Sequence, residues 1–143
     1  MLVSEIMHTG AVTVLPTDSA DKAARLLARH NIGVLPVVSE DGKLRGMVTD
    51  RDIVVRCVAA ENDPAETPLK EIMSRIVVTV SASDDIREAA RKMTAEQVRR
   101  LPVTENGKLV GMLSLGDLAR SGNCSMEAAK ALSEISSNLH RRV

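Results

Sequence analysis

Apolar residues recur along two stretches of the chain at the spacing that the buried face of an α-helix requires. The stretches are Ala20, Ala23, Ala24 and Leu27, and then Ile86, Ala89, Ala90 and Met93. Each stretch follows a candidate N-cap, Asp18 or Ser19 in the first and Ser83 in the second. The pattern predicts two amphipathic helices of about twelve residues each.

Short aliphatic and β-branched runs on either side of these stretches predict strands. Three pairs of runs stand at equivalent places, at 12–14 and 77–80, at 34–38 and 101–104, and at 44–48 and 109–113. Glycine-containing turns separate the second and third run of each half. A further helix is expected after each third run, so each half is predicted to be β-α-β-β-α.

The two halves are copies of each other. Residues 5–37 align with residues 71–103, and after the loss of one residue, 40–53 align with 105–118. Both copies contain EIM, VTV, LPV and GKL-x-GM. Because a unit of about 55 residues buries little core alone, we expect an α+β fold in which the two copies pack as a pseudo-twofold pair.

The repeat predicts three segments along the chain. The first copy is expected at 1–62, the second at 68–122, and a helical tail at 123–143. The polar, proline-broken sequence ENDPAETP at 61–68 predicts a surface connector. The tail helix carries an apolar stripe that needs a docking partner, on this chain or on a second copy, at Met126, Ala129, Leu132, Ile135 and Leu139.

The strand-to-helix junctions share the pattern Gly-x-x-[Thr/Ser]-x-x-Asp. They read GMVTDRD at 46–52 and GMLSLGD at 111–117. A helix start favours an anion, a hydroxyl can bind a ribose or phosphate oxygen, and a carboxylate can accept hydrogen bonds from ribose hydroxyls. The same spacing also fits a plain helix capping box, which is the stronger interpretation for one copy alone.

The presence of two such junctions in a tandem repeat favours a ligand site over a plain capping box. With EIM, LPV and GKL-x-GM, the chain resembles the CBS-domain family over residues 3–122, as two CBS motifs forming one Bateman module. Its tail resembles that of small stand-alone bacterial CBS proteins, including the hypoxia-response type, in which no catalytic domain is attached. The resemblance implies two pseudo-symmetric sites for adenosine-containing ligands.

The resemblance also implies roles for individual residues. Asp52 and Asp117 would hold the ribose, and Thr49 and Ser114 would touch ribose or phosphate. Adenine would be contacted by backbone and aliphatic groups near Val12, Leu35, Pro36, Val78, Leu101 and Pro102.

The two implied sites differ in charge. Only the second copy has basic residues before LPV, Arg99 and Arg100, where family members contact phosphate. Arg100 pairing with a carboxylate such as Asp50 is the alternative. Arg51 occupies the first junction, and Gly116 leaves room for a phosphate in the second. One site is therefore expected to be stronger than the other.

Composition narrows the function further. Lys+Arg and Asp+Glu are 19 each, and this zero formal charge argues against nucleic-acid binding. The lack of Phe, Trp and Tyr removes aromatic stacking platforms. No apolar run approaches the roughly 18 residues of a membrane span, and no signal peptide is visible, so a cytoplasmic location is expected.

No catalytic or metal-binding pattern stands out. His8, His30 and His140 have no spacing typical of a catalytic or zinc site. Cys57 and Cys124 read as reduced thiols, and a redox pair is the less favoured alternative. We expect no enzyme activity, no metal and no required cofactor.

The predicted function is therefore a regulatory, energy-sensing module that binds an adenine nucleotide or related adenosyl ligand. A homodimer is expected, because the apolar tail offers self-complementary surface and twofold dimers are the commonest assembly. An unidentified regulated protein is the other expected partner. A ligand-free dimerisation or docking module is the alternative.

Overall fold

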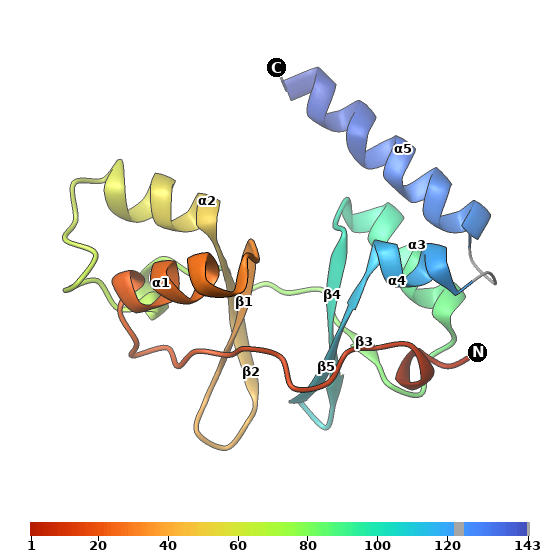
Figure 1. Ribbon diagram of the computed structural model, residues 1–143, viewed down its shortest axis with the longest axis horizontal. Helices are drawn as coiled ribbons and strands as arrows, with labels where there is room; N and C mark the ends of the chain where they lie inside the picture. Colours follow the sequence, from red (N-terminus) through yellow and green to blue (C-terminus); the bar gives the residue numbers. More distant parts are fainter. Residues whose placement is uncertain (122–124, 143) are drawn as a thin grey trace. The chain divides into compact units, whose positions relative to one another are not determined.

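The computed structural model describes residues 1–121 and 125–142, with side chains for 1–121 and 126–136. It divides into two compact units (Figure 1). The first-repeat unit is Ala11–Val77, and the second-repeat unit combines Met1–Gly10 with Val78–Val143. The start of the chain therefore belongs to the unit that the second repeat builds.

The first-repeat unit contains two helices and a two-stranded sheet. Its elements are α1 Ala20–His30, β1 Val34–Val38, β2 Leu44–Thr49, α2 Asp50–Ile53, the π-helical turn Val54–Val58 and the 3-10 turn Leu69–Glu71. Strands β1 and β2 are antiparallel. Helix α1 begins where Ser19 accepts a hydrogen bond from the Lys22 N–H, and it ends at Asn31 in the left-handed region.

The second-repeat unit contains the longer sheet and three helices. Its elements are the 3-10 turn Val3–Glu5, β3 Val80–Ser81, α3 Ile86–Glu96, β4 Arg100–Glu105, β5 Lys108–Ser114, α4 Leu115–Arg120 and α5 Ser125–Arg142. The sheet order is β3-β4-β5, with β3 parallel and β5 antiparallel to β4. Asp85 caps α3, not the predicted Ser83.

Each unit has its own hydrophobic core, and the predicted helical stripes face it. Ala20, Ala23 and Leu27 are buried on α1, and Ala24 packs against the same cluster. On α3 all four stripe residues are buried. These helices together with the two sheets confirm the predicted α+β class.

The first strand of each repeat is shorter than predicted. Around 12–14 only Val14 pairs, through an isolated bridge to Val37, and β3 does not begin before Val80. In the first repeat Pro16 follows closely, and a proline has no N–H to continue the hydrogen-bond ladder.

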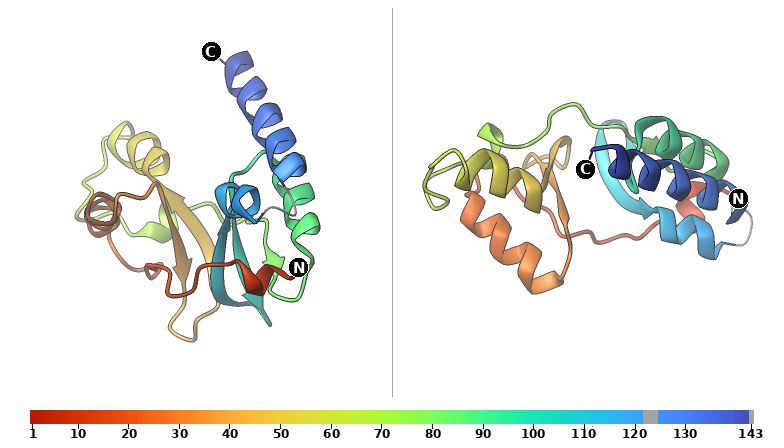
Figure 2. Two further views of the ribbon diagram at one scale, coloured as in Figure 1. Left: turned by 45° about the vertical axis from the view of Figure 1, so that its right-hand side comes forward. Right: turned by 90° about the horizontal axis from the view of Figure 1, so that it is seen from above.

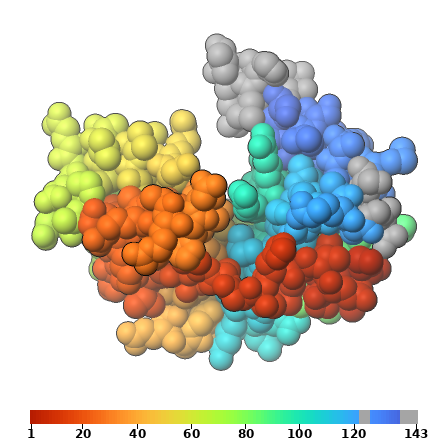
Figure 3. All heavy atoms as spheres, viewed as in Figure 1, coloured from red at the N-terminus to blue at the C-terminus, as the bar shows by residue number. Residues whose placement is uncertain are grey.

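The leading segment of each repeat packs in the compact unit that the other repeat builds. His8 and Met112 exchange two backbone hydrogen bonds of 2.9 Å, and Ser74 and Met47 exchange the equivalent pair at 2.9 and 3.0 Å. Figure 3 shows the first residues, in red, lying against the cyan and blue residues of the second repeat. The compact units and the sequence copies thus have different boundaries.

The connector between the repeats is attached to α1. The Ala20 N–H donates to the Thr67 carbonyl, and the Asp21 N–H donates to the Pro64 carbonyl. Thr67 is buried, whereas its neighbours Ala65 and Glu66 are exposed. The connector therefore lies on the surface, as predicted, and also satisfies N–H groups at the start of α1.

Helix α5 docks on its own unit, against α3 and α4 (Figure 2). Its buried residues are Ala128, Ala131 and Ile135. The predicted stripe is wrong in register, because Met126 and Ala129 are exposed and Leu132 is half-exposed. Ile135 is predicted correctly, and the Leu139 side chain lies outside the described residues. Small alanines allow α5 to approach α3 and α4 closely.

Candidate functional site

Both strand-to-helix junctions form the capping box that the sequence left open as an alternative. In the first repeat the Asp52 N–H donates to Thr49 Oγ1 at 3.0 Å, and the Thr49 N–H donates to Asp52 Oδ2 at 2.9 Å. Ser114 and Asp117 repeat this arrangement at 3.1 and 2.8 Å. Capping occupies Oδ2 of each carboxylate and leaves Oδ1 for other partners.

The partners of the second carboxylate oxygen, Oδ1, differ between Asp117 and Asp52. Asp117 Oδ1 lies 2.8 Å from His8 Nε2 and 2.7 Å from Arg120 Nη2, and Asp117 is only 6% exposed. Asp52 Oδ1 has Arg56 Nε at 3.9 Å. Asp117 is therefore held by two side chains, whereas the corresponding oxygen of Asp52 has one distant cation.

His8 reaches Asp117 because the leading segment of the first repeat packs beside β5. Burial raises the pKa of Asp117, but hydrogen bonds from the Ser114 backbone and from His8 outweigh it and hold the pKa below its usual value. The folded state therefore favours the ionised carboxylate. Its contribution to stability is present above the unfolded pKa and is lost as the pH falls through the folded pKa.

We expect Asp117→Asn to lower the free energy of unfolding at pH 7 by about 1.5 kcal/mol, through weaker charge-assisted hydrogen bonds. Asp52→Asn is the matched control, and its cost should be smaller. Urea unfolding at pH 7, 5 and 3 measures both. The Asp117→Asn cost should shrink as the pH falls from the unfolded pKa toward the lower folded pKa, where the wild-type carboxyl also becomes protonated. Equal costs for both variants at every pH would contradict the assignment.

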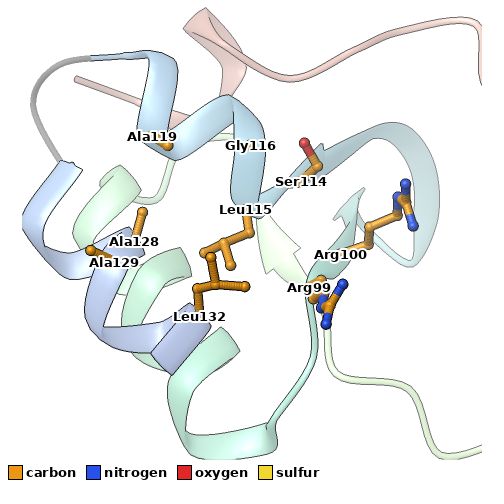
Figure 4. Close-up of a pocket in the computed structure, with 9 residues that line it drawn as sticks. All are labelled: Arg99, Arg100, Ser114, Leu115, Gly116, Ala119, Ala128, Ala129 and Leu132. Carbon is orange, nitrogen blue, oxygen red and sulfur yellow. The ribbon is translucent and has the colours of Figure 1, made fainter. Parts of the chain in front are cut away.

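A cavity of about 520 Å³ lies in the second-repeat unit beside this junction. Figure 4 shows its lining residues: Arg99, Arg100, Ser114, Leu115, Gly116, Ala119, Ala128, Ala129 and Leu132. Four of them are predicted site residues, namely Arg99, Arg100, Ser114 and Gly116. Asp117 is not among them, so the structure gathers the predicted phosphate-binding residues around a space that this carboxylate does not line.

The cavity has an apolar end and a cationic end. Leu115 of α4 and Leu132 of α5 extend toward one another, and Arg99 and Arg100 lie at the side away from α5 (Figure 4). Within the described part of the second-repeat unit, neither arginine is paired with a carboxylate. The space therefore suits a ligand with an apolar body and an anionic group.

The sequence did not assign any residue of α5 to a ligand site. Ala128, Ala129 and Leu132 line the cavity, as do Leu115 and Ala119 of α4. The available signal was the apolar tail stripe, which contains Ala129 and Leu132. It indicated that the tail needs a contact without indicating where.

The equivalent position in the first-repeat unit has a different charge. Gly33 stands where the second repeat has Arg99, and the carboxylate of Asp50 would lie 3.7 Å from a Cβ at Gly33. Arg51 is exposed at the start of α2, and its N–H donates to Asp50 Oδ1 at 2.8 Å. This junction therefore places a carboxylate where the other has guanidinium groups.

The residues expected to contact adenine lie in or near the two cores. Leu35 and Leu101 are fully buried, and Pro36 and Pro102 are buried beside them in β1 and β4. Val12 and Val78 are partly buried. Val12 packs against the core of the first-repeat unit, and Val78 packs against the core of the second-repeat unit. Their contact with a base stays a prediction.

Other candidate chemistry is sparse in the described residues. Residues 1–121 and 126–136 contain no group of three or more His, Cys, Asp or Glu side chains arranged to hold a metal ion. No described helix combines the length and hydropathy needed to cross a membrane. Cys57 is buried with its Sγ 3.6 Å from the Asn62 carbonyl oxygen, and Cys124 and the His140 side chain lie outside the described residues.

Comparison with known proteins finds the same repeat elsewhere. The family model of the CBS domain matches residues 3–58 and 69–122. The CBS domain-containing protein YhcV of Bacillus subtilis is 40% identical over 139 residues, which is 96% of this chain and 98% of that protein. The crystal structure of hypoxic response protein I with two coordinated zinc ions is 37% identical, with a TM-score of 0.78, and the match covers 84% of this chain and 98% of that one.

Two further crystal structures contain adenosine compounds. CBSX2 in complex with AMP is 27% identical with a TM-score of 0.74, and the match covers 85% of this chain and 95% of that one. The CBS domain pair of protein MJ0100, in complex with 5′-methylthioadenosine and S-adenosyl-L-methionine, is 31% identical with a TM-score of 0.74. That match covers 87% of this chain and 98% of the other.

Proposed function

Because the chain belongs to the CBS-domain family and carries two CBS motifs, we propose that it is a non-catalytic regulatory module that binds an adenine nucleotide or related adenosyl compound. The observation that carries the proposal is the cavity of the second-repeat unit, which combines an aliphatic end with the guanidinium groups of Arg99 and Arg100. AMP and S-adenosyl-L-methionine are bound by similar proteins, and both contain adenosine.

The phosphate end of a nucleotide fits the second-repeat unit better than the first. Arg99 and Arg100 supply planar, permanently charged donors that suit phosphate, and Ser114 adds a hydroxyl at the same cavity. In the first-repeat unit Asp50 lies near Gly33 instead, and a carboxylate repels phosphate. We therefore assign the stronger nucleotide site to the second repeat.

The ribose role of the two aspartates is also unequal in this proposal. A ribose at Asp117 must compete with His8 and Arg120 for Oδ1, whereas at Asp52 it meets a single cation 3.9 Å away. Displacing two short contacts from a buried carboxylate costs more than displacing one long contact. Asp52 is therefore the more available carboxylate, although its site lacks the arginines.

The proposal includes a homodimer and an unidentified regulated protein as partners, in the cytoplasm, with the nucleotide as regulatory ligand and no required cofactor. The exposed Val54, Val55 and Val58 beside α2 supply apolar surface for such a partner. The same surface fits the alternative, a ligand-free dimerisation or docking module, so only ligand binding separates the two.

A thermal-shift experiment with AMP, ADP, ATP, S-adenosyl-L-methionine and adenosine tests the proposal. At 100 times the dissociation constant, linkage gives about 2.7 kcal/mol of stabilisation, or a rise in Tm of roughly 5–10 °C for a chain of this size. Absence of any shift at millimolar ligand would favour the docking module.

Alanine variants at the two aspartates extend this test. Asp52→Ala and Asp117→Ala should each reduce the ligand-induced rise, and the double variant should abolish it. If the aspartates act only as caps, each variant lowers the Tm without ligand, at a cost of about 1 kcal/mol, and leaves the rise unchanged. The ligand-induced rises therefore decide between the roles, and the absolute Tm values do not.

A further inference from the structure

Helix α5 forms one wall of the cavity proposed to bind the ligand. Leu132 extends into the space toward Leu115, and Ala128 and Ala129 line the same wall (Figure 4). Leu132 is 46% exposed, so a large part of its side chain lies open to solvent beside the cavity. This apolar surface has no role in the core of the unit.

Two of the three buried side chains on the described part of α5 are small. Among the α5 side chains that the structure describes, at 126–136, the buried ones are Ala128, Ala131 and the larger Ile135. Buried apolar area sets the strength of such docking, at about 25 cal/mol per Å², and alanine methyl groups contribute little of it. The position of α5 is therefore sensitive to any added contact on its cavity side.

We propose that α5 is part of the ligand site, and that a bound adenine nucleotide connects α5 to the start of β4. The flat adenine contacts Leu115, Ala129 and Leu132, while the phosphate contacts Arg99 and Arg100. This placement of the base replaces the one at Val78, Leu101 and Pro102, which do not line the cavity. This inference rests on the proposed function and adds a helix outside the CBS motifs to it. The ligand thereby strengthens the docking of α5 on α4.

The dimensions and chemistry of the cavity support this arrangement. Its volume of about 520 Å³ lies within the range of ligand pockets, about 300–1,000 Å³. Its aliphatic end can cover a purine without aromatic residues, and the chain has none. Coupling is reciprocal, so the factor by which the nucleotide strengthens the docking of α5 equals the factor by which docked α5 strengthens nucleotide binding.

A single tryptophan at Leu132 reports directly on this wall. Because the chain has no Trp, Tyr or Phe, Leu132→Trp gives an emission signal without background. AMP should quench this emission through adenine stacking and should do so with saturation. Ser133→Trp is the matched control, because Ser133 is exposed and does not line the cavity, and its emission should not respond. Inorganic phosphate should quench neither variant.

A charge on the same wall tests binding without relying on fluorescence. Ala129→Glu places a carboxylate at the cavity, where it repels the nucleotide and competes for Arg99 and Arg100. We expect AMP binding to weaken at least tenfold. Ser133→Glu adds the same charge at an exposed residue that does not line the cavity, and it should weaken binding much less than Ala129→Glu does. Both sites are exposed, so both variants should fold, as circular dichroism would verify.

The possible outcomes separate this inference from the proposed function. If AMP neither stabilises nor binds wild type, the proposed function fails, and the inference fails with it. If AMP binds wild type and Ala129→Glu binds it as well as Ser133→Glu does, the role of α5 is overturned and the proposed function stands. A selective loss in Ala129→Glu together with a selective response in Leu132→Trp supports the inference.

Discussion

Replacing both Arg99 and Arg100 by alanine is expected to weaken AMP binding by about 100-fold and to leave adenosine binding within about threefold of wild type. A hydrogen bond to a charged group contributes about 1.5–3 kcal/mol. Because both arginines are exposed, we expect each contribution to lie near the lower end of that range, so that each substitution weakens AMP binding about tenfold. Adenosine lacks the phosphate and should be nearly unaffected.

Equilibrium dialysis measures both ligands in the same variant. Without Trp, Tyr or Phe, the protein adds little near-ultraviolet absorbance to that of the nucleotide. Arg29→Ala with Arg45→Ala is the matched control, because it removes the same charge from exposed positions of the first-repeat unit. Equal losses for AMP and adenosine would assign Arg99 and Arg100 to structure and not to phosphate.

The second large effect is expected on stability, at the two glycines where the exchanged segments pack. A Cβ at Gly111 would lie 2.7 Å from Met7 Sδ and 2.9 Å from the His8 carbonyl oxygen. A Cβ at Gly46 would lie 2.6 Å from the Ser74 carbonyl oxygen. Backbone oxygens cannot move aside without straining the paired hydrogen bonds, so Gly46→Ala and Gly111→Ala should each cost about 1–3 kcal/mol.

Gly33→Ala is the matched control for both glycines. Its Cβ would meet only Asp50 Oδ2, at an ordinary 3.7 Å, and the change from glycine restricts the unfolded chain. We expect it to be neutral or to stabilise by up to about 1 kcal/mol. Urea unfolding provides the comparison. If Gly111→Ala behaves like Gly33→Ala, the leading segment does not pack rigidly beside β5.

The elements of the fold were predictable where a local pattern determines them. The stripe from Ile86 to Met93 indicates α3 because four apolar positions at helical spacing form one face that packs on a core. Leu101 and Val103 mark β4 in the same way, since alternate strand residues face the core. Each of these patterns occurs twice because the sequence is repeated. The match to the CBS-domain family model confirms the resemblance that the repeat suggested.

Features that depend on distant partners were not predictable. His8 lies 109 positions before Asp117, and no local pattern indicates that they meet. The register of α5 depends on how closely Ala128 and Ala131 approach neighbouring helices, while hydropathy alone favoured Met126 and Leu132. Asp85 caps α3 instead of Ser83 because the helix starts two residues later than the serine would allow.

The exchange of leading segments also determines the order in which the molecule can be completed during synthesis. All residues of the first-repeat unit lie between Ala11 and Val77, so it can fold as soon as that stretch has left the ribosome, as domains generally do. Met1–Gly10 are made before this unit, yet their partners in β5 are made about a hundred residues later. Residues 1–10 can therefore take their final position only after β5 has been made.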